Sequence, residues 1–292
     1  MTRHRFLKVQ GTGNDFVLFP PEVQPEALSV EQIRRLCDRH FGVGSDGVLF
    51  VAPSARGDFM MRMFNPDGTE AEMCGNGIRC FAKYLRDSGL STKDVVPIES
   101  RVGLHACRVF PGPDGAVAEV EVGMGKADYD RSAVGMKGSG TFVRRPIERS
   151  GRRFLATTVS MGNPHLVIFE PLTIPKAERT GPLFESHPAF ARRTNVEFVE
   201  QAGEQHLKVV VYERGAGITL ACGTGACAAF AAAAIENRID PARPVRVDLA
   251  GGTLTIRRDE QGEIWMRGPA VVVYEGTIDL EFAPASAASA AG

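Results

Sequence analysis

The chain has 292 residues, 43% of them apolar, and a formal net charge of −1. This length and composition allow a large buried core and two domains. The near-zero charge gives no electrostatic reason for nucleic acid or acidic lipid as a partner. No apolar run has the length of a membrane span or the character of a signal peptide, so we expect a soluble, cytoplasmic protein without a membrane partner.

Apolar runs separated by turn residues predict that the first half is rich in strands. Strands are expected at residues 6–10, 16–19, 48–51, 59–64, 95–98, 104–110 and 117–122. A helix is expected at residues 30–37, because Ser29 and Gln32 have the spacing of a capping box.

Two short segments share one pattern, a cysteine followed by Gly-x-Gly at the start of a helix. They are residues 74–77 (Cys-Gly-Asn-Gly) and 222–225 (Cys-Gly-Thr-Gly). Each cysteine is therefore expected at a helix N-terminus, where unpaired N–H groups and the helix dipole stabilise an anion. This placement predicts a lowered thiol pKa and a binding site for a carboxylate.

The second half of the sequence repeats the first. Cys74 corresponds to Cys222 at an offset of 148 residues, and Asn65 corresponds to Glu213 at the same offset. Further pairs have an offset of 149 residues: Gly13-Asn14 with Gly162-Asn163, Phe41 with Phe190, Asp46 with Asn195 and Gly103 with Gly252. An internal duplication explains this register, and it predicts a pseudo-two-fold axis across which the two cysteines face each other.

We therefore expect an α+β fold of two pseudo-symmetric, duplicated domains. The charged, glycine-bearing segment 126–153 is the candidate boundary, which places the domains at about 1–124 and 125–270. Residues 284–292 contain only Ala and Ser between the first and last residue, so they are expected to form a disordered tail.

All six cysteines are expected to be free thiols, because a cytoplasmic chain of this size needs no disulfides. The cysteine spacings lack the histidines of a structural zinc site, so no metal is expected. There is no glycine-rich phosphate loop of the P-loop or dinucleotide type, so no cofactor is expected either. Cys37, Cys80, Cys107 and Cys227 are interpreted as small, buried apolar residues.

Two cysteines on opposite sides of one site suit the inversion of a carbon acid next to a carboxylate. One thiolate removes the proton, and the opposing thiol delivers another from the other face. The negative charge that spreads onto the carboxylate needs preorganised donors, and the N–H groups of both Gly-x-Gly segments can supply them. This chemistry needs no cofactor.

Several polar loop residues have both a functional and a structural interpretation. They are Asn14, Asn65, Asn163, Asn195, Glu213, Arg214 and His165. Asparagine often occurs in a turn because it tolerates the left-handed backbone conformation. Four asparagines at or near repeat-related positions favour a role in binding instead. Glu213 and Arg214 could form a solvated ion pair, and His165 could be a structural histidine or the proton partner of a cysteine.

Six segments carry a closer resemblance: residues 11–16 (GTGNDF), 74–80 (CGNGIRC), 160–165 (SMGNPH), 193–198 (RTNVEF), 212–217 (YERGAG) and 221–227 (ACGTGAC). In this order they resemble the diaminopimelate epimerase family over nearly the whole chain. The resemblance implies a cofactor-independent enzyme that interconverts L,L- and meso-2,6-diaminopimelate on the bacterial route to lysine and peptidoglycan. It also implies that strands close around a central helix in each domain, and that a last strand at about 271–283 returns to the first domain.

The resemblance also implies roles for individual residues. Cys74 and Cys222 would be the acid and base, assisted by His165 and Glu213. The residues implied to hold the reacting carboxylate are Gly75, Asn76, Gly223 and Thr224. Those implied to bind the distal amino-acid end are Asn14, Asn65, Asn163, Asn195 and Arg214. The oligomeric state is left open, with a homodimer as one arrangement.

The chain departs from the family pattern at two positions. Gly47 follows Asp46 where some members carry Gln, and Ile218 stands where Glu is usual. Both departures lie outside the cysteine motifs. Two alternatives remain open: a related proline-racemase-like or phenazine-pathway-type isomerase, and a two-domain amino-acid-binding module, which would need no opposed thiols.

Overall fold

The computed structural model describes residues 3–280, so the expected tail at 284–292 lies outside the described residues. The helices are α1 Val30–Cys37, α2 Gly75–Asp87, α3 Ile174–Glu185 and α4 Gly223–Ile235, with a 3₁₀ turn at Pro25–Ala27. Within residues 3–280, none of these helices is long and apolar enough to cross a membrane.

Strands are the main regular secondary structure of the described chain. The strands are β1 Arg3–Gly11, β2 Asn14–Phe19, β3 Val48–Ala52, β4 Phe59–Phe64, β5 Val95–Ser100, β6 Gly103–Pro111, β7 Val117–Gly123, β8 Arg145–Arg149, β9 Arg152–Ser160, β10 Pro164–Ile168, β11 Asn195–Gly203, β12 His206–Glu213, β13 Gly217–Ile218, β14 Val245–Leu249, β15 Gly252–Arg258, β16 Ile264–Pro269 and β17 Val271–Asp279. Every strand predicted in the first half is confirmed, with small differences at the ends.

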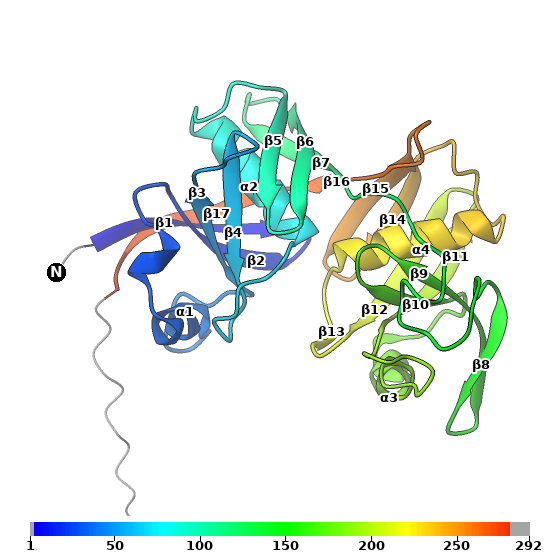
Figure 1. Cartoon of the computed structure of the whole chain (residues 1–292). Helices are drawn as coiled ribbons and strands as arrows, with labels where there is room; N and C mark the ends of the chain where they lie inside the picture. The colour runs from blue at the N-terminus through cyan, green and yellow to red at the C-terminus, as the bar shows by residue number, and fades with distance from the viewer. Residues whose placement is uncertain (1–2, 281–292) are drawn as a thin grey trace, which may run out of the picture.

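The strand pairing of the second half repeats that of the first. In the first half β1–β2, β3–β4, β5–β6 and β6–β7 are antiparallel, while β2–β3 and β4–β5 are parallel. In the second half β9–β10, β11–β12, β14–β15 and β15–β16 are antiparallel, while β10–β11 and β12–β14 are parallel. The two halves lie side by side in Figure 1. The predicted α+β fold with a duplicated architecture is confirmed, and the domain limits near residue 125 stay a prediction.

Turns at repeat-related positions also have the same backbone conformation. Gly13 has φ +81° and its counterpart Gly162 has φ +90°, both in the left-handed region that favours glycine. Gly103 and Gly252, which begin equivalent strands, have φ +150° and +146°. The duplication predicted from sequence spacing therefore extends to the local geometry of the loops.

The helices α2 and α4 are the centres of the two halves, and each has 13 residues. α4 is alanine-rich and apolar around its whole circumference, so it can lie in the core with strands on all sides. On α2 the apolar side chains of Ile78, Phe81 and Leu85 lie on one face of the helix and are fully buried. Each helix belongs to a separate apolar cluster, which gives each half its own core.

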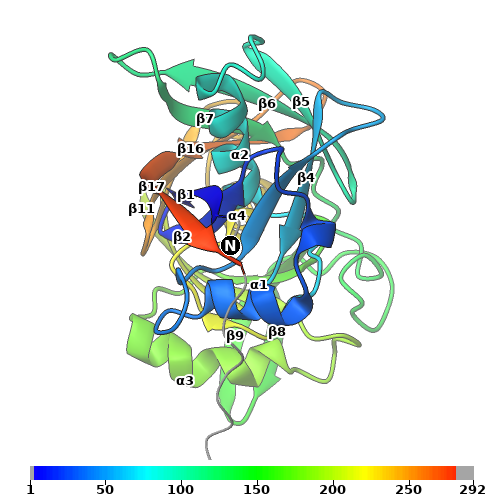
Figure 2. The same ribbon diagram turned by 90° about the vertical axis from the view of Figure 1, so that its left-hand side faces the viewer.

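The helices α1 and α3 pack outside these cores, on the same side of the molecule (Figures 1 and 2). The helix α1 has the predicted bounds and capping box: the Ser29 side chain accepts from the Gln32 N–H, and the Gln32 side chain accepts from the Ser29 N–H. Ile33 and Leu36 of α1 pack into an apolar cluster with Phe50 of β3. The helix α1 therefore packs against the outer face of the first-half strands.

Strand pairing and one turn help to join the two halves. The strand β7 pairs with β16, with Val122 opposite Met266. The strand β17 then pairs with β1, so the end of the chain returns to the first half as predicted. The β1–β2 turn packs against the second half, because a Cβ on Gly251 would lie 2.0 Å from the Thr12 carbonyl oxygen.

The Gly251→Ala substitution tests this contact between the β1–β2 turn and the second half. The added methyl group would clash with the Thr12 backbone, so we expect the free energy of unfolding to fall by about 1–3 kcal/mol. Urea unfolding measures this loss. The control is Gly203→Ala, where a Cβ meets only the Cβ of His206 at 3.4 Å. Equal stability of the two variants would contradict the close packing of the two halves.

Candidate active site

Each motif cysteine is the N-cap residue of a central helix, as the sequence predicts. The Cys74 sulfur accepts a hydrogen bond from the Gly77 N–H of α2 at 3.4 Å. The Cys222 sulfur accepts from the Gly225 N–H of α4, also at 3.4 Å. The two thiols therefore occupy equivalent positions in the two halves.

The structure brings the two cysteine segments together. The Asn76 side-chain amide donates to the Ala221 carbonyl, one residue before Cys222, at 3.1 Å. The Met266 side chain lies against both Gly-x-Gly segments: a Cβ on Gly75 would be 2.8 Å from its Cε, and one on Gly223 would be 3.0 Å from its sulfur. The first glycine of each motif therefore packs against the same methionine side chain.

The expected lowering of the thiol pKa is wrong for the structure as it stands. Burial raises the pKa of Cys74, and the negative charge of Glu213 adds to this. Burial and Glu213 also raise the pKa of Cys222, well above its ordinary value. The N–H groups at the helix N-termini do oppose these shifts, but desolvation of a thiolate has the larger effect.

The pH dependence of thiol alkylation tests this correction. A raised pKa favours the protonated form of both thiols at neutral pH, so they ionise at a higher pH than an ordinary cysteine does. We expect alkylation of Cys74 and Cys222 by iodoacetamide, followed by peptide mass spectrometry, to accelerate about tenfold per pH unit from pH 7 to 9. A rate that levels off below pH 7.5 would contradict the buried, protonated state.

Asn14 lies next to the first cysteine and is held by the loop before β3. Its side-chain oxygen is 3.6 Å from the Cys74 sulfur, and its amide nitrogen donates to the Asp46 carboxylate at 2.8 Å. Arg39 also donates to this carboxylate, at 2.8 Å. Asp46 therefore supplies a polar contact from the loop in which Gly47 departs from the family pattern.

Asn65 lies apart from the hydrogen bonds that Asn14 forms. Its side chain donates to the Thr69 hydroxyl at 3.0 Å, within the turn that its own backbone forms with Thr69 and Gly68. Among residues 3–280, the structure gives it no hydrogen bond to either cysteine segment. Its predicted binding role stays a prediction.

On the side of Cys222, His165 and Asn163 form a buried chain of hydrogen bonds. The Asn163 amide donates to the Thr224 hydroxyl at 3.3 Å, and that hydroxyl is 3.4 Å from the Cys222 sulfur. The Asn163 oxygen lies 2.8 Å from His165 Nε2. His165 Nδ1 lies 2.7 Å from a Glu197 oxygen, and both side chains are fully buried.

Glu197 was missed by the sequence interpretation, although it lies within the motif at 193–198. Its second carboxylate oxygen is buried without a hydrogen-bond partner among the described residues, and burial raises its pKa. A signal was present: Glu197 interrupts an apolar run in β11 whose first five residues are all buried. A charged residue in a strand buried on both faces needs a partner, and here the partner is His165.

Removing the Glu197 carboxylate tests this pair. In Glu197→Ala, His165 Nδ1 loses its partner in a dry environment, so we expect the free energy of unfolding to fall by about 3 kcal/mol or more. Glu197→Gln still offers a hydrogen bond, and its loss should be clearly smaller. Denaturant unfolding at pH 7 compares the two variants. Equal losses would show that shape, not the hydrogen bond, matters at this position.

Glu213, Arg214 and Asn195 meet at the end of β12. The Asn195 side-chain oxygen accepts from the Arg214 backbone N–H at 2.8 Å, which fixes this corner to β11. The Thr219 hydroxyl donates to the Glu213 carboxylate, one residue after the departure at Ile218. The Arg214 guanidinium is exposed and donates to the Arg192 carbonyl at 3.3 Å. The solvated Glu213–Arg214 ion pair, the structural alternative for these two residues, is not formed in the described chain.

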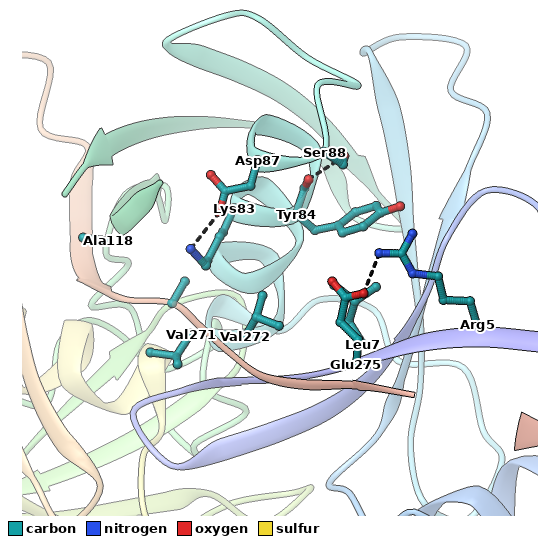
Figure 3. A pocket seen from close by; sticks show the side chains of 11 residues that line it. Arg5, Leu7, Lys83, Tyr84, Asp87, Ser88, Ala118, Val271, Val272 and Glu275 are labelled. Atoms are coloured by element: carbon teal, nitrogen blue, oxygen red, sulfur yellow. Dashed lines mark hydrogen bonds and ion pairs between the residues drawn. The ribbon is translucent and has the colours of Figure 1, made fainter. Parts of the chain in front are cut away.

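The other cysteines, possible metal ligands and one cavity were compared with this site. All six cysteines are free thiols, as predicted, and Cys37, Cys80, Cys107 and Cys227 are buried. Within residues 3–280, no group of three or more His, Cys, Asp or Glu side chains could hold a metal ion. A cavity of about 600 Å³ between α2 and β17 contains no cysteine, and the charged residues on its wall form ion pairs, Arg5 with Glu275 and Lys83 with Asp87 (Figure 3).

Comparison with solved structures identifies the fold. A probable proline racemase from Agrobacterium radiobacter K84 superposes with a TM-score of 0.72 over 95% of this chain and 93% of that chain, at 15% identity. At this identity the likeness establishes the duplicated fold that this chain shares with that protein.

The sequence comparisons identify the family. The sequence profile described as Diaminopimelate epimerase matches residues 6–129 and 157–273. A diaminopimelate epimerase from Synechococcus sp. (strain JA-3-3Ab) is 47% identical, covering 94% of this chain and 98% of that protein. One from Leptospira biflexa is 43% identical, covering 94% and 99%. The chain belongs to the diaminopimelate epimerase family.

Proposed function

We propose that this enzyme interconverts L,L- and meso-2,6-diaminopimelate by transferring protons between Cys74, Cys222 and the α-carbon of the substrate. One observation supports the proposal: in a chain of this family, two cysteines occupy equivalent helix N-termini, and a hydrogen bond joins the two cysteine segments. Placed on opposite faces of the α-carbon, one sulfur removes the proton and the other donates a different proton. The configuration of that carbon is then inverted.

The reacting carboxylate would lie between the N-termini of α2 and α4. The donors proposed for it are the N–H groups of Gly75, Asn76, Gly223 and Thr224, which both helix dipoles reinforce. These groups are fixed before the substrate arrives, so they stabilise the charge that spreads onto the carboxylate as the α-proton leaves. A metal or cofactor has no role in this proposal.

One cysteine must give up its proton before the reaction begins. Glu213 raises the pKa of both thiols, so its negative charge acts at both. We propose that the substrate ammonium group offsets this charge, which makes a thiolate available when substrate is bound. His165 and Glu213 are the groups proposed to receive and return the proton.

The distal end of the substrate carries a second ammonium and a second carboxylate. The exposed guanidinium of Arg214 suits that carboxylate, because it makes one hydrogen bond to a backbone carbonyl and retains other donors. Asn14, Asn65, Asn163 and Asn195 are proposed to complete this recognition. Hydrogen-bonded recognition of this kind can reject an analogue that lacks the group by about 10⁴-fold.

A cytoplasmic location and a homodimer complete the proposal. Val271, Val273 and Tyr274 of β17 expose apolar surface that a second copy of the chain could cover. Light scattering coupled to size-exclusion chromatography measures the oligomeric state directly. A monomer at all concentrations would remove the homodimer from the proposal and leave the chemistry unaffected.

The function is tested by proton NMR of L,L-diaminopimelate in D₂O with the reduced enzyme. We expect meso product and deuterium at one α-position with the wild type, and losses in rate of about 10²–10⁴-fold in Cys74→Ala and Cys222→Ala. Cys107→Ala, a buried cysteine of β6, should retain activity. Lack of turnover by the wild type would contradict the substrate. Unchanged turnover in either cysteine variant would contradict the two-thiol chemistry.

A further inference from the structure

Arg79 is the largest fully buried side chain described in the chain, and its charge has an unusual environment. It lies one turn into α2, at 0% exposure. Its guanidinium donates to four neutral oxygens: Asn76 Oδ1 at 3.0 Å, the Thr12 hydroxyl at 3.2 Å, and the Gly75 and Pro269 carbonyls at 3.3 Å. Within residues 3–280, no carboxylate forms a hydrogen bond or ion pair with it. Buried charges are usually paired with an opposite charge, so this exception calls for a reason.

The position of Arg79 connects both halves of the molecule. Thr12 belongs to the β1–β2 turn, Asn76 to α2, and Pro269 to β16, which pairs with strands of both halves. One side chain therefore ties together the turn beside Cys74, the helix that Cys74 caps, and the strand that carries Met266. Its planar group of five donors can make these bonds at once, which a lysine cannot do.

The contact with Asn76 fixes which way that amide points. A guanidinium only donates hydrogen bonds, so the atom that faces it must be the Asn76 oxygen. The Asn76 nitrogen is then directed to the Asn14 oxygen at 3.2 Å and the Ala221 carbonyl at 3.1 Å. Asn14 adjoins the Cys74 sulfur, and Ala221 precedes Cys222. One amide, held by Arg79, thus bridges the two cysteine segments.

Arg79 also breaks the symmetry of the duplication. At the offset of 148 residues that relates the two cysteines, its counterpart in α4 is Cys227. A buried positive charge is therefore present on the Cys74 side alone, where it opposes the rise in the pKa of that thiol. On the other side, Glu197 raises the pKa of Cys222, while Glu213 raises the pKa of both thiols.

We propose that Arg79 is a positioning residue for proton transfer: it holds the Asn76 amide that sets the two cysteine segments in register, and its unpaired charge favours the anion on the Cys74 side. This inference rests on the proposed function for its catalytic consequence. Its electrostatic consequence can be measured without substrate.

The test compares Arg79→Met and Arg79→Lys with Lys83→Met. Lys83 lies one turn further along α2 than Arg79 and is also buried. Its ammonium group donates to the Asp87 carboxylate and the Val117 carbonyl. Along the helix it is further from the cysteine segments than Arg79 is. Lys83→Met therefore controls for loss of a buried cation from the same helix. Each variant is examined for unfolding by urea, for kcat and KM, and for alkylation of Cys74 and Cys222 by iodoacetamide as a function of pH.

In Arg79→Met we expect kcat to fall about 100-fold, because the register of the two segments is lost, with a smaller change in KM. The pH of half-maximal alkylation of Cys74 should rise by about one unit or more, and that of Cys222 by less. Lys83→Met should show neither effect. Arg79→Lys keeps the charge, so we expect nearly wild-type alkylation but a reduced kcat.

A folded Arg79→Met with wild-type kcat, or with unchanged alkylation of Cys74, overturns the proposal. If Arg79→Met does not fold, Arg79→Lys decides, since wild-type kcat in that variant would show that the fork of donors is not needed. Lack of turnover by the wild type would count against the proposed substrate, while the alkylation of Cys74 would still test the electrostatic role of Arg79.

Discussion

The meeting of two helix N-termini is the constraint on which this structure depends. Each N-terminus carries unpaired N–H groups and a partial positive charge, so bringing two together is unfavourable unless something compensates. The cysteine sulfurs accept one N–H at each helix, and the Asn76 amide bridges the gap by binding the Ala221 carbonyl. The other N–H groups of the two N-termini favour an anion. In the proposed function, the substrate carboxylate is that anion.

Burial makes the thiolate form unfavourable at the same site. The helix N-termini favour the anion, but desolvation and Glu213 raise the pKa of both cysteines. A raised pKa favours the protonated and less reactive form of both thiols. In the proposed function, a charged substrate changes this balance. The two halves differ in their charges: Arg79 lies on the Cys74 side, while Glu197 and His165 form the neighbouring pair of Cys222. Two similar halves can in this way give two cysteines different roles.

Local sequence patterns predicted much of the fold, because each pattern depends on interactions between residues that are close in the chain. The capping box at Ser29, the cysteines as N-caps and the glycine turns depend on neighbours within a few residues. The duplication was visible as a constant offset. The sign of the thiol pKa shift was missed, because it depends on burial by distant strands. Glu197 and Arg79 were missed for a related reason: their partners, His165 and Thr12, are 32 and 67 residues away in the chain.

The most direct test of two opposed thiols is the isotopic content of substrate and product at the start of the reaction in D₂O. With L,L-diaminopimelate at less than about one tenth conversion, a mechanism with two bases places solvent deuterium in the product and leaves protium in the recovered substrate. We expect this pattern from the wild-type enzyme. Product that retains the original hydrogen, or deuterium entering recovered substrate as fast as product, would indicate a single base and contradict the account.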